Sequence, residues 1–240
     1  MRVFAIGDLH LEGGTGKRMD RFGENWVDHD RKIFESWERV GDEDDLLLLV
    51  GDITWAMRFE EARPDLERIG RMKGLKLMLK GNHDYWWQTV SKMRKALPPS
   101  IKLIHASAFI KDRIAIAGTR GWLCPNDDYF KEEEDGPIYL REVGRLRVAL
   151  QSLEGRRDEY DKLIVAMHYP PMNDKHETSG FTELIDEARA DICVFGHVHG
   201  EAIRRTFTGA RNSTEYFLAS ADAIDFSPAR IDTKLSGRKE

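Results

Sequence analysis

Short apolar runs recur along the chain, and glycine, aspartate or proline bounds most of them. Runs of roughly four to six apolar residues are typical of strands that are covered on both faces. Six such runs lie at residues 3–6, 46–50, 75–79, 114–118, 163–167 and 192–195. The sequence therefore predicts a core built around buried strands.

Between the first three runs, the apolar residues recur at helical spacing. This spacing predicts amphipathic helices over residues 29–39 and 59–72, and it returns over residues 138–153. Strands that alternate with helices in this way indicate an α/β domain whose first half forms a largely parallel sheet.

The second half of the chain adds signals for antiparallel hairpins. Residues 201–207 and 214–220 flank a Gly/Asn/Ser turn signal, and residues 105–118 would turn at Asp112-Arg113. We expect the polar segment 119–137 to be a solvated loop, with a lid over a site as the alternative.

The length and composition are typical of one globular domain. The 240 residues are 41% hydrophobic and 33% charged, so we expect a single domain over 1–240 with a polar tail at about 229–240. A net charge of -5 argues against a nucleic-acid polymer as partner. Two cysteines are too few for a disulfide framework, and no apolar run suits a signal or membrane segment. We expect a cytoplasmic protein with no membrane partner, and the oligomeric state stays open.

Polar side chains follow five of the apolar runs, at the point where each predicted strand ends. They belong to Asp8, His10, Asp52, Asn82, His83, Asp84, His168, His197 and His199. Open α/β sheets bind ligands at the carboxyl ends of their strands, so we expect all five ends to meet at one crevice. Asp8-Leu9-His10 and Gly51-Asp52 alone are weak evidence, because such turns are common, while G-N-H-D and G-H-V-H are more distinctive. The conjunction of all five motifs is what indicates a site.

The types and spacing of these residues indicate metal ions. Asp8 and His10 are two residues apart, as are His197 and His199, and extended backbone would place each pair on one face. Imidazoles, carboxylates and an amide oxygen are suitable ligands for Mn, Fe or Zn. Since seven ligands exceed the need of one ion, we expect two divalent ions that share a carboxylate.

In this order the motifs resemble those of the calcineurin-like metallophosphoesterases. The matching blocks are D-L-H (8–10), G-D (51–52), G-N-H-D (81–84), H (168) and G-H-V-H (196–199). The resemblance implies a four-layer α/β/β/α sandwich, in which helices flank two mixed β-sheets. It also implies a dinuclear metal site at the carboxyl-terminal ends of the strands.

The resemblance also implies how the ligands are shared between the two ions. The first ion would be held by Asp8, His10 and His199. The second would be held by Asn82, His168 and His197, and Asp52 would bridge both ions.

The same resemblance implies a reaction. His83 matches the catalytic histidine of the family, and Asp84 matches the acidic residue that orients it. A hydroxide bridging two ions about 3.5–4 Å apart would attack phosphorus, and His83 would give a proton to the leaving group. The expected activity is hydrolysis of a phosphomonoester or phosphodiester, with a small nucleotide-like or metabolite substrate.

The second block departs from that of the Ser/Thr protein phosphatases. Trp55 and Ala56 stand where those enzymes carry Asp-Arg, and Lys80 precedes G-N-H-D. Their phosphate-gripping arginines are not matched, which disfavours protein phosphatase activity. Two alternatives stay open: a dinuclear hydrolase of a non-phosphate bond, and a metal-binding scaffold without turnover.

Further residues are candidates for contact with the substrate. Arg120 and Trp122 follow a strand-like run, and Tyr169 follows the fourth motif. Arg120 would either clamp a phosphate or form a surface ion pair. We expect residues 85–87, Tyr-Trp-Trp, to begin a helix that packs on the sheet, with a stacking wall for a nucleobase as the alternative.

Overall fold

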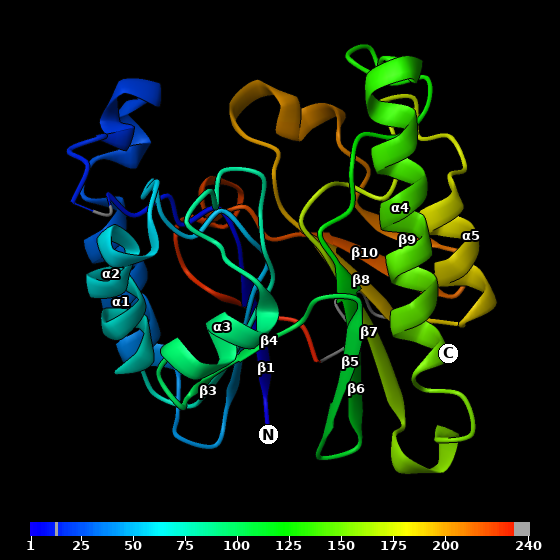
Figure 1. The fold of residues 1–240 in the computed structure, drawn as a ribbon, viewed down its shortest axis with the longest axis horizontal. Coiled ribbons are helices and arrows are strands. Elements are labelled where there is room, and N and C mark those ends of the chain that lie inside the picture. Colours follow the sequence, from blue (N-terminus) through cyan, green and yellow to red (C-terminus); the bar gives the residue numbers. More distant parts are fainter. Residues whose placement is uncertain (13, 233–240) are drawn as a thin grey trace.

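Two β-sheets lie face to face in the centre of the molecule, and helices cover the outer face of each. Figure 1 shows this arrangement in the computed structural model, which describes residues 1–12 and 14–232. Each sheet contains both parallel and antiparallel pairs. The predicted four-layer α/β/β/α sandwich with two mixed sheets is therefore confirmed.

The first sheet has the strand order β11-β1-β2-β3-β4. Its strands are β1 (Val3–Ile6), β2 (Leu46–Leu49), β3 (Leu75–Met78), β4 (Ile101–Leu103) and β11 (Ala229–Arg230). β1 to β4 run parallel, and β11 pairs with β1 in the antiparallel direction. The largely parallel first half is therefore confirmed, while the short strands β4 and β11 were not predicted.

The second sheet has the strand order β5-β6-β7-β8-β10-β9. Its strands are β5 (Ser107–Lys111), β6 (Ile114–Thr119), β7 (Lys162–Met167), β8 (Ile192–Phe195), β9 (Gly209–Arg211) and β10 (Thr214–Leu218). β6, β7, β8 and β10 are parallel, and the edge strands β5 and β9 are antiparallel to their neighbours.

Helices cover both outer faces and connect the strands. The α-helices are α1 (His29–Val40), α2 (Phe59–Gly70), α3 (Val90–Ala96), α4 (Glu132–Gln151) and α5 (Gly180–Glu187). The 3-10 segments are η1 (Met19–Phe22), η2 (Glu24–Trp26), η3 (Arg157–Glu159), η4 (Gly200–Arg205) and η5 (Ala221–Ile224). Trp37 of α1 and Leu66 of α2 are buried on the first sheet, and Leu146 of α4 and Phe181 of α5 on the second.

A third apolar layer fills the space between the sheets. Leu48 and Val50 from the first sheet and Ile164 and Val194 from the second are fully buried in it. Because these strands are covered on both faces, their sequences are apolar at successive positions rather than at alternate ones.

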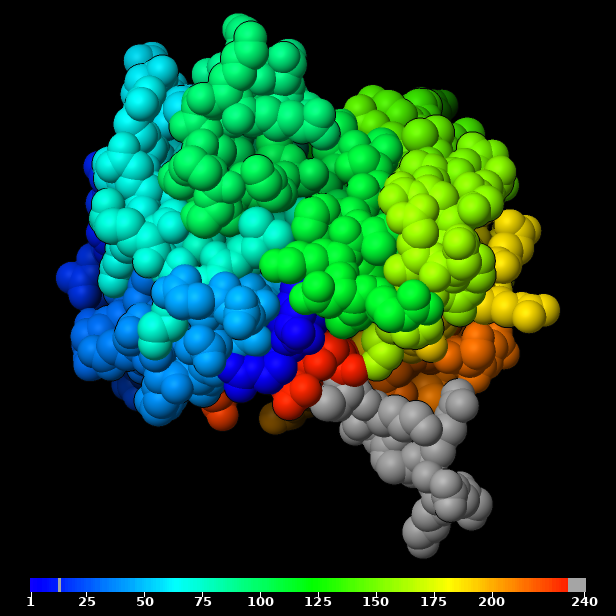
Figure 2. Space-filling view, turned by 90° about the horizontal axis from the view of Figure 1, so that it is seen from below, coloured from blue at the N-terminus to red at the C-terminus, as the bar shows by residue number. Residues whose placement is uncertain are grey.

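The amino-terminal ends of the central strands lie at a closed end of the sandwich. Figure 2, seen from below, shows the N-terminus (blue) beside the β5–β6 turn (green) and the residues around β11 (red). The Met1 ammonium lies 3.8 Å from the Asp112 carboxylate of that turn. The carboxyl ends of the strands therefore meet at the opposite end of the molecule.

One of the two predicted hairpins is confirmed, and the other is displaced. β5 and β6 turn at Asp112-Arg113, whose φ angles of 49° and 62° are left-handed. The first arm of the second hairpin was wrongly placed at 201–207, where η4 forms instead. The hairpin joins β9 to β10 through a two-residue turn, because Asn212 adopts the left-handed φ of 53° that such a turn needs.

The long polar segment contains the start of a helix. Residues 119–137 were expected to be a loop, but α4 begins at Glu132. Four acidic residues occupy its first turn, where the positive end of the helix dipole stabilises negative charge. Pro137 lies inside α4, where it lacks the N–H of one intrahelical hydrogen bond.

The expected helix start at residues 85–87 and the expected tail are also corrected. α3 begins at Val90, after the N-cap Thr89, and Trp86 is buried near Phe59 without being part of a helix. Residues 229–230 form β11 and residue 231 is buried, so the tail does not begin at 229. The rest of the predicted tail, 233–240, lies outside the described residues.

Candidate metal centre

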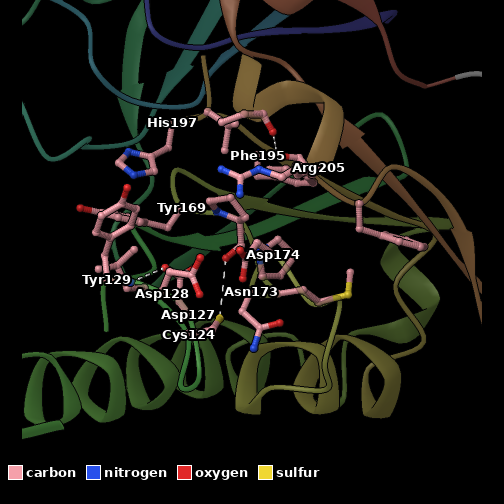
Figure 3. Close-up of a pocket in the computed structure, with 18 of the residues that line it drawn as sticks. Cys124, Asp127, Asp128, Tyr129, Tyr169, Asn173, Asp174, Phe195, His197 and Arg205 are labelled. Atoms are coloured by element: carbon pink, nitrogen blue, oxygen red, sulfur yellow. Dashed lines mark hydrogen bonds between the residues drawn. The ribbon is translucent and has the colours of Figure 1, made fainter. Parts of the chain in front are cut away.

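A cavity of about 310 Å³ opens near the carboxyl ends of β6, β7 and β8. Its lining includes His197, His199, Trp122 and Tyr169, and Figure 3 shows the Tyr169 ring beside His197. The ring centroids of Tyr169 and His197 are 4.0 Å apart, and those of Trp122 and Tyr169 are 5.0 Å apart. Two of the three candidates for substrate contact therefore lie in the wall of a cavity that reaches the predicted metal ligands.

Arg120, the third candidate, is held elsewhere. Its guanidinium lies 3.5 Å from the buried Glu142 carboxylate and 4.5 Å over the Trp122 ring. Burial lowers the pKa of Arg120, and its Nε is buried without a hydrogen-bond partner. The expected ion pair is present but largely buried rather than on the surface, so a phosphate clamp would require Arg120 to leave Glu142.

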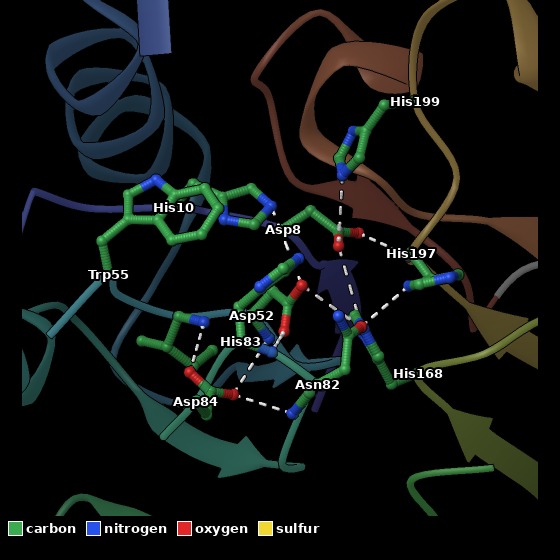
Figure 4. Close-up of polar contacts among 12 residues, drawn as sticks. Asp8, His10, Asp52, Trp55, Asn82, His83, Asp84, His168, His197 and His199 are labelled. Carbon is green, nitrogen blue, oxygen red and sulfur yellow. Dashed lines mark hydrogen bonds and ion pairs between the residues drawn. The ribbon is translucent and has the colours of Figure 1, made fainter. Parts of the chain in front are cut away.

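The predicted ligands meet beside this cavity, together with His83 and Asp84 (Figure 4). The first sheet supplies four of them, from the segments after β1, β2 and β3: Asp8, His10, Asp52 and Asn82. The second sheet supplies three, from the segments after β7 and β8: His168, His197 and His199. The expected convergence of five strand ends is therefore found.

The backbone reaches this arrangement through left-handed turns. Asp8, His10, Asp52 and His197 have φ angles of 58°, 44°, 53° and 73°. The expectation that extended backbone aligns the paired ligands is wrong for this reason. Non-glycine residues in the left-handed region cost of order 1 kcal/mol or more each, and such strain gathers at functional sites.

Two glycines allow the ligand segments to approach one another closely. A Cβ atom on Gly81 would lie 2.0 Å from Asp52 Oδ1, and one on Gly196 would lie 2.4 Å from Asp8 Oδ2. No real Cβ contact is that short, so only glycine permits this packing at either position.

Ligand atoms gather in two groups that could each hold a metal ion. One group is Asp8, His10 and His199, the other is Asp52, His168 and His197, and within each the ligand atoms lie within 4.8 Å of one another. Asp52 Oδ2 is 3.8 Å from His10 Nε2 and 3.5 Å from His168 Nε2. The Asp52 carboxylate thus lies between the groups, where a bridging ligand would have to be.

Asn82 belongs with the second group. Its Oδ1 lies 2.7 Å from His168 Nε2 and 2.9 Å from His197 Nδ1. An amide oxygen that faces two ring nitrogens is placed where it could share an ion with both imidazoles.

The electrostatics of the site fit a pair of bound cations. Burial raises the pKa of Asp52 to about 8, and the negative charge of Asp8 adds to the rise. Asp8 Oδ1 and His10 Nδ1 are buried without a hydrogen-bond partner. Burial also lowers the pKa of His197 to about 3, so its imidazole is neutral and keeps a lone pair for a metal. Two carboxylates buried together must share a proton or hold positive charge between them, and bound cations would let both be ionised.

His199 is fixed by a residue that the sequence analysis missed. Its Nδ1 lies 2.8 Å from the Asp222 carboxylate, and its Nε2 lies 3.4 Å from Asp8 Oδ1. Burial alone would lower the pKa of His199, but the carboxylates of Asp8 and Asp222 raise it to about 10. A carboxylate behind a histidine orients the ring toward a metal. Asp222 follows β10 as the other acids follow their strands, so the same rule could have found it.

Asp84 organises backbone rather than the His83 ring. Its carboxylate accepts hydrogen bonds from the amides of Asp52, Ile53 and Gly81 at 3.0, 2.8 and 2.7 Å, and from the Trp86 indole at 3.0 Å. Among the described residues, no hydrogen bond joins it to His83. No direct hydrogen bond therefore supports the expectation that Asp84 orients His83.

His83 lies at the open side of the centre. Its ring centroid is 5.7 Å from that of His10 and 4.8 Å from that of Trp55. Its backbone amide donates to Asp52 Oδ1 at 2.8 Å. The half-buried His83 ring is therefore near the ligands, and the His83 backbone amide helps to fix the Asp52 carboxylate between the two groups.

The arrangement of this site agrees with a comparison of the sequence with protein families. The model of the calcineurin-like phosphoesterases matches residues 1–201. The chain belongs to that family. Among curated proteins, a search finds no match to this calcineurin-like phosphoesterase. No described helix is both long and apolar enough to cross a membrane.

Solved structures resemble this family member in fold. Phosphopantetheinyl hydrolase from Mycobacterium tuberculosis has a TM-score of 0.60 and 14% identity, with 100% of this chain and 98% of that chain covered. Protein TT1561 of Thermus thermophilus has a TM-score of 0.55 and 13% identity, with 82% of each chain covered. At these identities the likeness shows the fold alone.

Proposed function

We propose that this protein hydrolyses a small phosphomonoester or phosphodiester with the help of two divalent metal ions, such as Mn, Fe or Zn. The observation that carries the proposal is the meeting of seven ligand side chains in two adjoining groups at the strand ends. Membership of the phosphoesterase family supports the reaction type. The two cysteines, which are free and buried, support a reducing compartment such as the cytoplasm.

The ions would supply an activated water and positive charge for the phosphoryl oxygens. Asp52 lies where it would hold both ions, and Asn82 would complete the second group. His83 stands at the open side, where it would donate a proton to the oxygen of the departing alcohol. Asp84 would act through the backbone, by fixing the amides of Asp52 and Gly81.

The test is hydrolysis of p-nitrophenyl phosphate and bis-p-nitrophenyl phosphate by protein loaded with Mn²⁺. We expect turnover of at least one ester, loss of activity after chelation, and recovery when Mn²⁺ returns. Asp8→Asn should abolish this activity, whereas Asp44→Asn, a matched change of an exposed acid, should leave it intact. Activity that survives chelation would overturn the proposal, and metal binding without any turnover would favour a scaffold.

A further inference from the structure

The lining of the cavity beside the metal ligands combines aromatic and apolar side chains with charged ones. Aromatic rings and prolines contribute to its lining, including Trp122, Tyr129, Tyr169, Pro170 and Phe207. A volume of about 310 Å³ is at the small end of the range for small-molecule sites. Aromatic faces of this kind bind apolar groups and also attract cations.

Charge in the cavity is distributed unevenly. Figure 3 shows His197 and Arg205 along one side, and Asp127, Asp128 and Asp174 across the cavity from them. The guanidinium of Arg205 makes no ion pair with any described residue, which leaves it available to an anion. The metal-ligand side is therefore suited to a phosphate group, and the far side carries three carboxylates.

No described residue forms a salt bridge with the carboxylates of Asp127, Asp128 or Asp174 on the far side. Asp174 Oδ1 is buried without a hydrogen-bond partner. Burial raises the pKa of Asp127, and the carboxylates of Asp174 and Asp128 raise it further. Lys175 is the nearby cation: its charge opposes this rise in the pKa of Asp127, but its Nζ donates to the Asn126 carbonyl at 2.8 Å and forms no salt bridge with the three carboxylates. This face of the cavity is thus complementary to a positive group.

The two acidic segments are held in place by hydrogen bonds. Asn173 is buried, and its amide nitrogen donates to the Pro125 carbonyl at 2.9 Å. Its Oδ1 accepts from the amides of Lys175 and Glu177, each at 3.1 Å. Asp127 and Asp174 are therefore set in position before any ligand arrives, which lowers the entropic cost of binding.

We propose that the substrate is a phosphate ester whose organic part carries a positively charged amine. Its phosphate lies at the metal ligands and Arg205, and its ammonium group lies between the aromatic walls and the carboxylates of Asp127 and Asp174. This inference rests on the proposed phosphoesterase function and narrows its substrate. Water adds to phosphorus, the ester P–O bond breaks, and the amino alcohol leaves after taking up a proton.

The first test compares two esters of equal shape and different charge. Choline phosphate and 3,3-dimethylbutyl phosphate differ by a quaternary nitrogen in place of a carbon, and phosphoethanolamine tests a primary amine. Phosphate release by Mn²⁺-loaded protein should give a kcat/KM at least about tenfold higher for the charged ester. Equal values, a preference for the neutral ester, or cleavage of only the nitrophenyl esters would overturn the inference.

Substitutions then locate the charge preference. Asp174→Asn should reduce the ratio of the two kcat/KM values toward one, since it removes the negative charge while keeping the side-chain size. The matched change Asp44→Asn, an exposed acid away from the cavity lining, should leave the ratio unchanged. A ratio that is the same in both variants would contradict the placement of the ammonium group at Asp174.

A binding measurement separates this inference from the proposed function. Calorimetric titration of choline and of 3,3-dimethylbutanol into metal-free protein needs no turnover. Preferential binding of choline, lost in Asp174→Asn, supports the cationic site even if no ester is hydrolysed. If the nitrophenyl esters are cleaved but neither alcohol binds preferentially, the phosphoesterase function stands and the amine specificity fails.

Discussion

At the residue scale, the site depends on a glycine, Gly81, whose backbone lies so close to Asp52 that a side chain at position 81 would clash. Gly81→Ala would place a Cβ atom 2.0 Å from Asp52 Oδ1 and 2.2 Å from its amide nitrogen. Because Asp52 lies between the two ligand groups, we expect this variant to lose at least about tenfold in affinity for Mn²⁺, comparable to losing an outer-shell partner. Calorimetric titration of Mn²⁺ would measure the loss.

Gly144→Ala is the matched control for Gly81→Ala. Gly144 lies exposed in α4, and a Cβ atom there would meet nothing within 4 Å. Gly144→Ala should bind Mn²⁺ like the parent and gain about 0.5–1 kcal/mol in free energy of unfolding, because alanine favours a helix over glycine. Equal Mn²⁺ affinity in the Gly81 and Gly144 variants would show that the close approach at Asp52 is unimportant.

His83 gives a second prediction at this scale. His83→Ala keeps the backbone amide that donates to Asp52 Oδ1, so metal binding should persist. Turnover of esters with poor leaving groups should fall by about 10²-fold or more, since the proton donor is gone. The fall should be smaller for nitrophenyl esters, whose leaving groups need less help.

The histidine prediction needs both kinetics and a metal titration. His105→Ala is the control, because His105 lies in the segment between β4 and β5 and belongs to neither ligand group. Wild-type turnover of an alkyl phosphate by His83→Ala would remove His83 from the reaction.

From the sequence, the grouping of side chains could be predicted where ligand chemistry recurs along the chain, but contacts that depend on packing could not. Asp8 and His197 could be recognised because ligand-type side chains follow five strand-like runs of the same chain. The role of Asp84 could not, since two of its four donors are the distant main-chain amides of Asp52 and Ile53. The importance of Arg205 and Asp174 depends on a cavity that no local pattern encodes.

At the element scale, a buried lysine joins helix α2 to strand β3. Lys76 is fully buried, and its ammonium donates to the carbonyls of Gly70, Met72 and Gly74 at the end of α2. Lys76→Met would leave the carbonyls of Met72 and Gly74 without this donor, while the Gly70 carbonyl keeps the Ser100 hydroxyl at 2.7 Å, and we expect a cost of about 1–3 kcal/mol in free energy of unfolding. Urea denaturation measures this loss, and Lys102→Met, on the exposed side of β4, should change stability by less than about 0.5 kcal/mol.

The same lysine predicts a dependence on pH. Burial lowers the pKa of Lys76 from 10.5 to about 8. Between these values the unfolded chain holds a proton that the folded protein releases, so this group makes stability rise as pH increases. The stability difference between wild type and Lys76→Met should therefore grow from pH 8 to 10.5, and a constant difference would contradict the assignment.

Helices and strands could be predicted from the sequence where enough of their residues are buried to give a clear apolar pattern. The strands around Leu48 and Ile164 are covered on both faces, so their runs are unambiguous. β4 and β11 have three and two residues, too few to show a period. The start of α4 was missed because its first turn is acidic, which favours a helix start but carries no apolar signal, and because Pro137 follows inside the helix.

At the scale of the whole molecule, the ligand groups tie the two sheets together. The first group takes Asp8 and His10 from one sheet and His199 from the other, and the second takes Asp52 from one and His168 from the other. Bound ions would therefore add links between layers that otherwise meet mainly through apolar contacts and a few polar ones, such as that between His168 Nδ1 and the Val50 carbonyl at 2.9 Å. Binding to the folded state alone raises its stability by RT ln(1 + [L]/Kd).

We therefore expect Mn²⁺ to raise the thermal midpoint of the metal-free protein, by an amount equivalent to about 2.7 kcal/mol per site at a hundredfold excess over Kd. Asp52→Asn should lose most of this gain, because Asp52 Oδ2 lies within 3.8 Å of a ligand from each group. Asp44→Asn should keep it. Thermal melts followed by circular dichroism over a range of Mn²⁺ concentrations measure the shift in all three proteins. An equal shift in the Asp52 and Asp44 variants would mean that the ions bind elsewhere, because a site between the sheets cannot lose its central carboxylate without losing affinity.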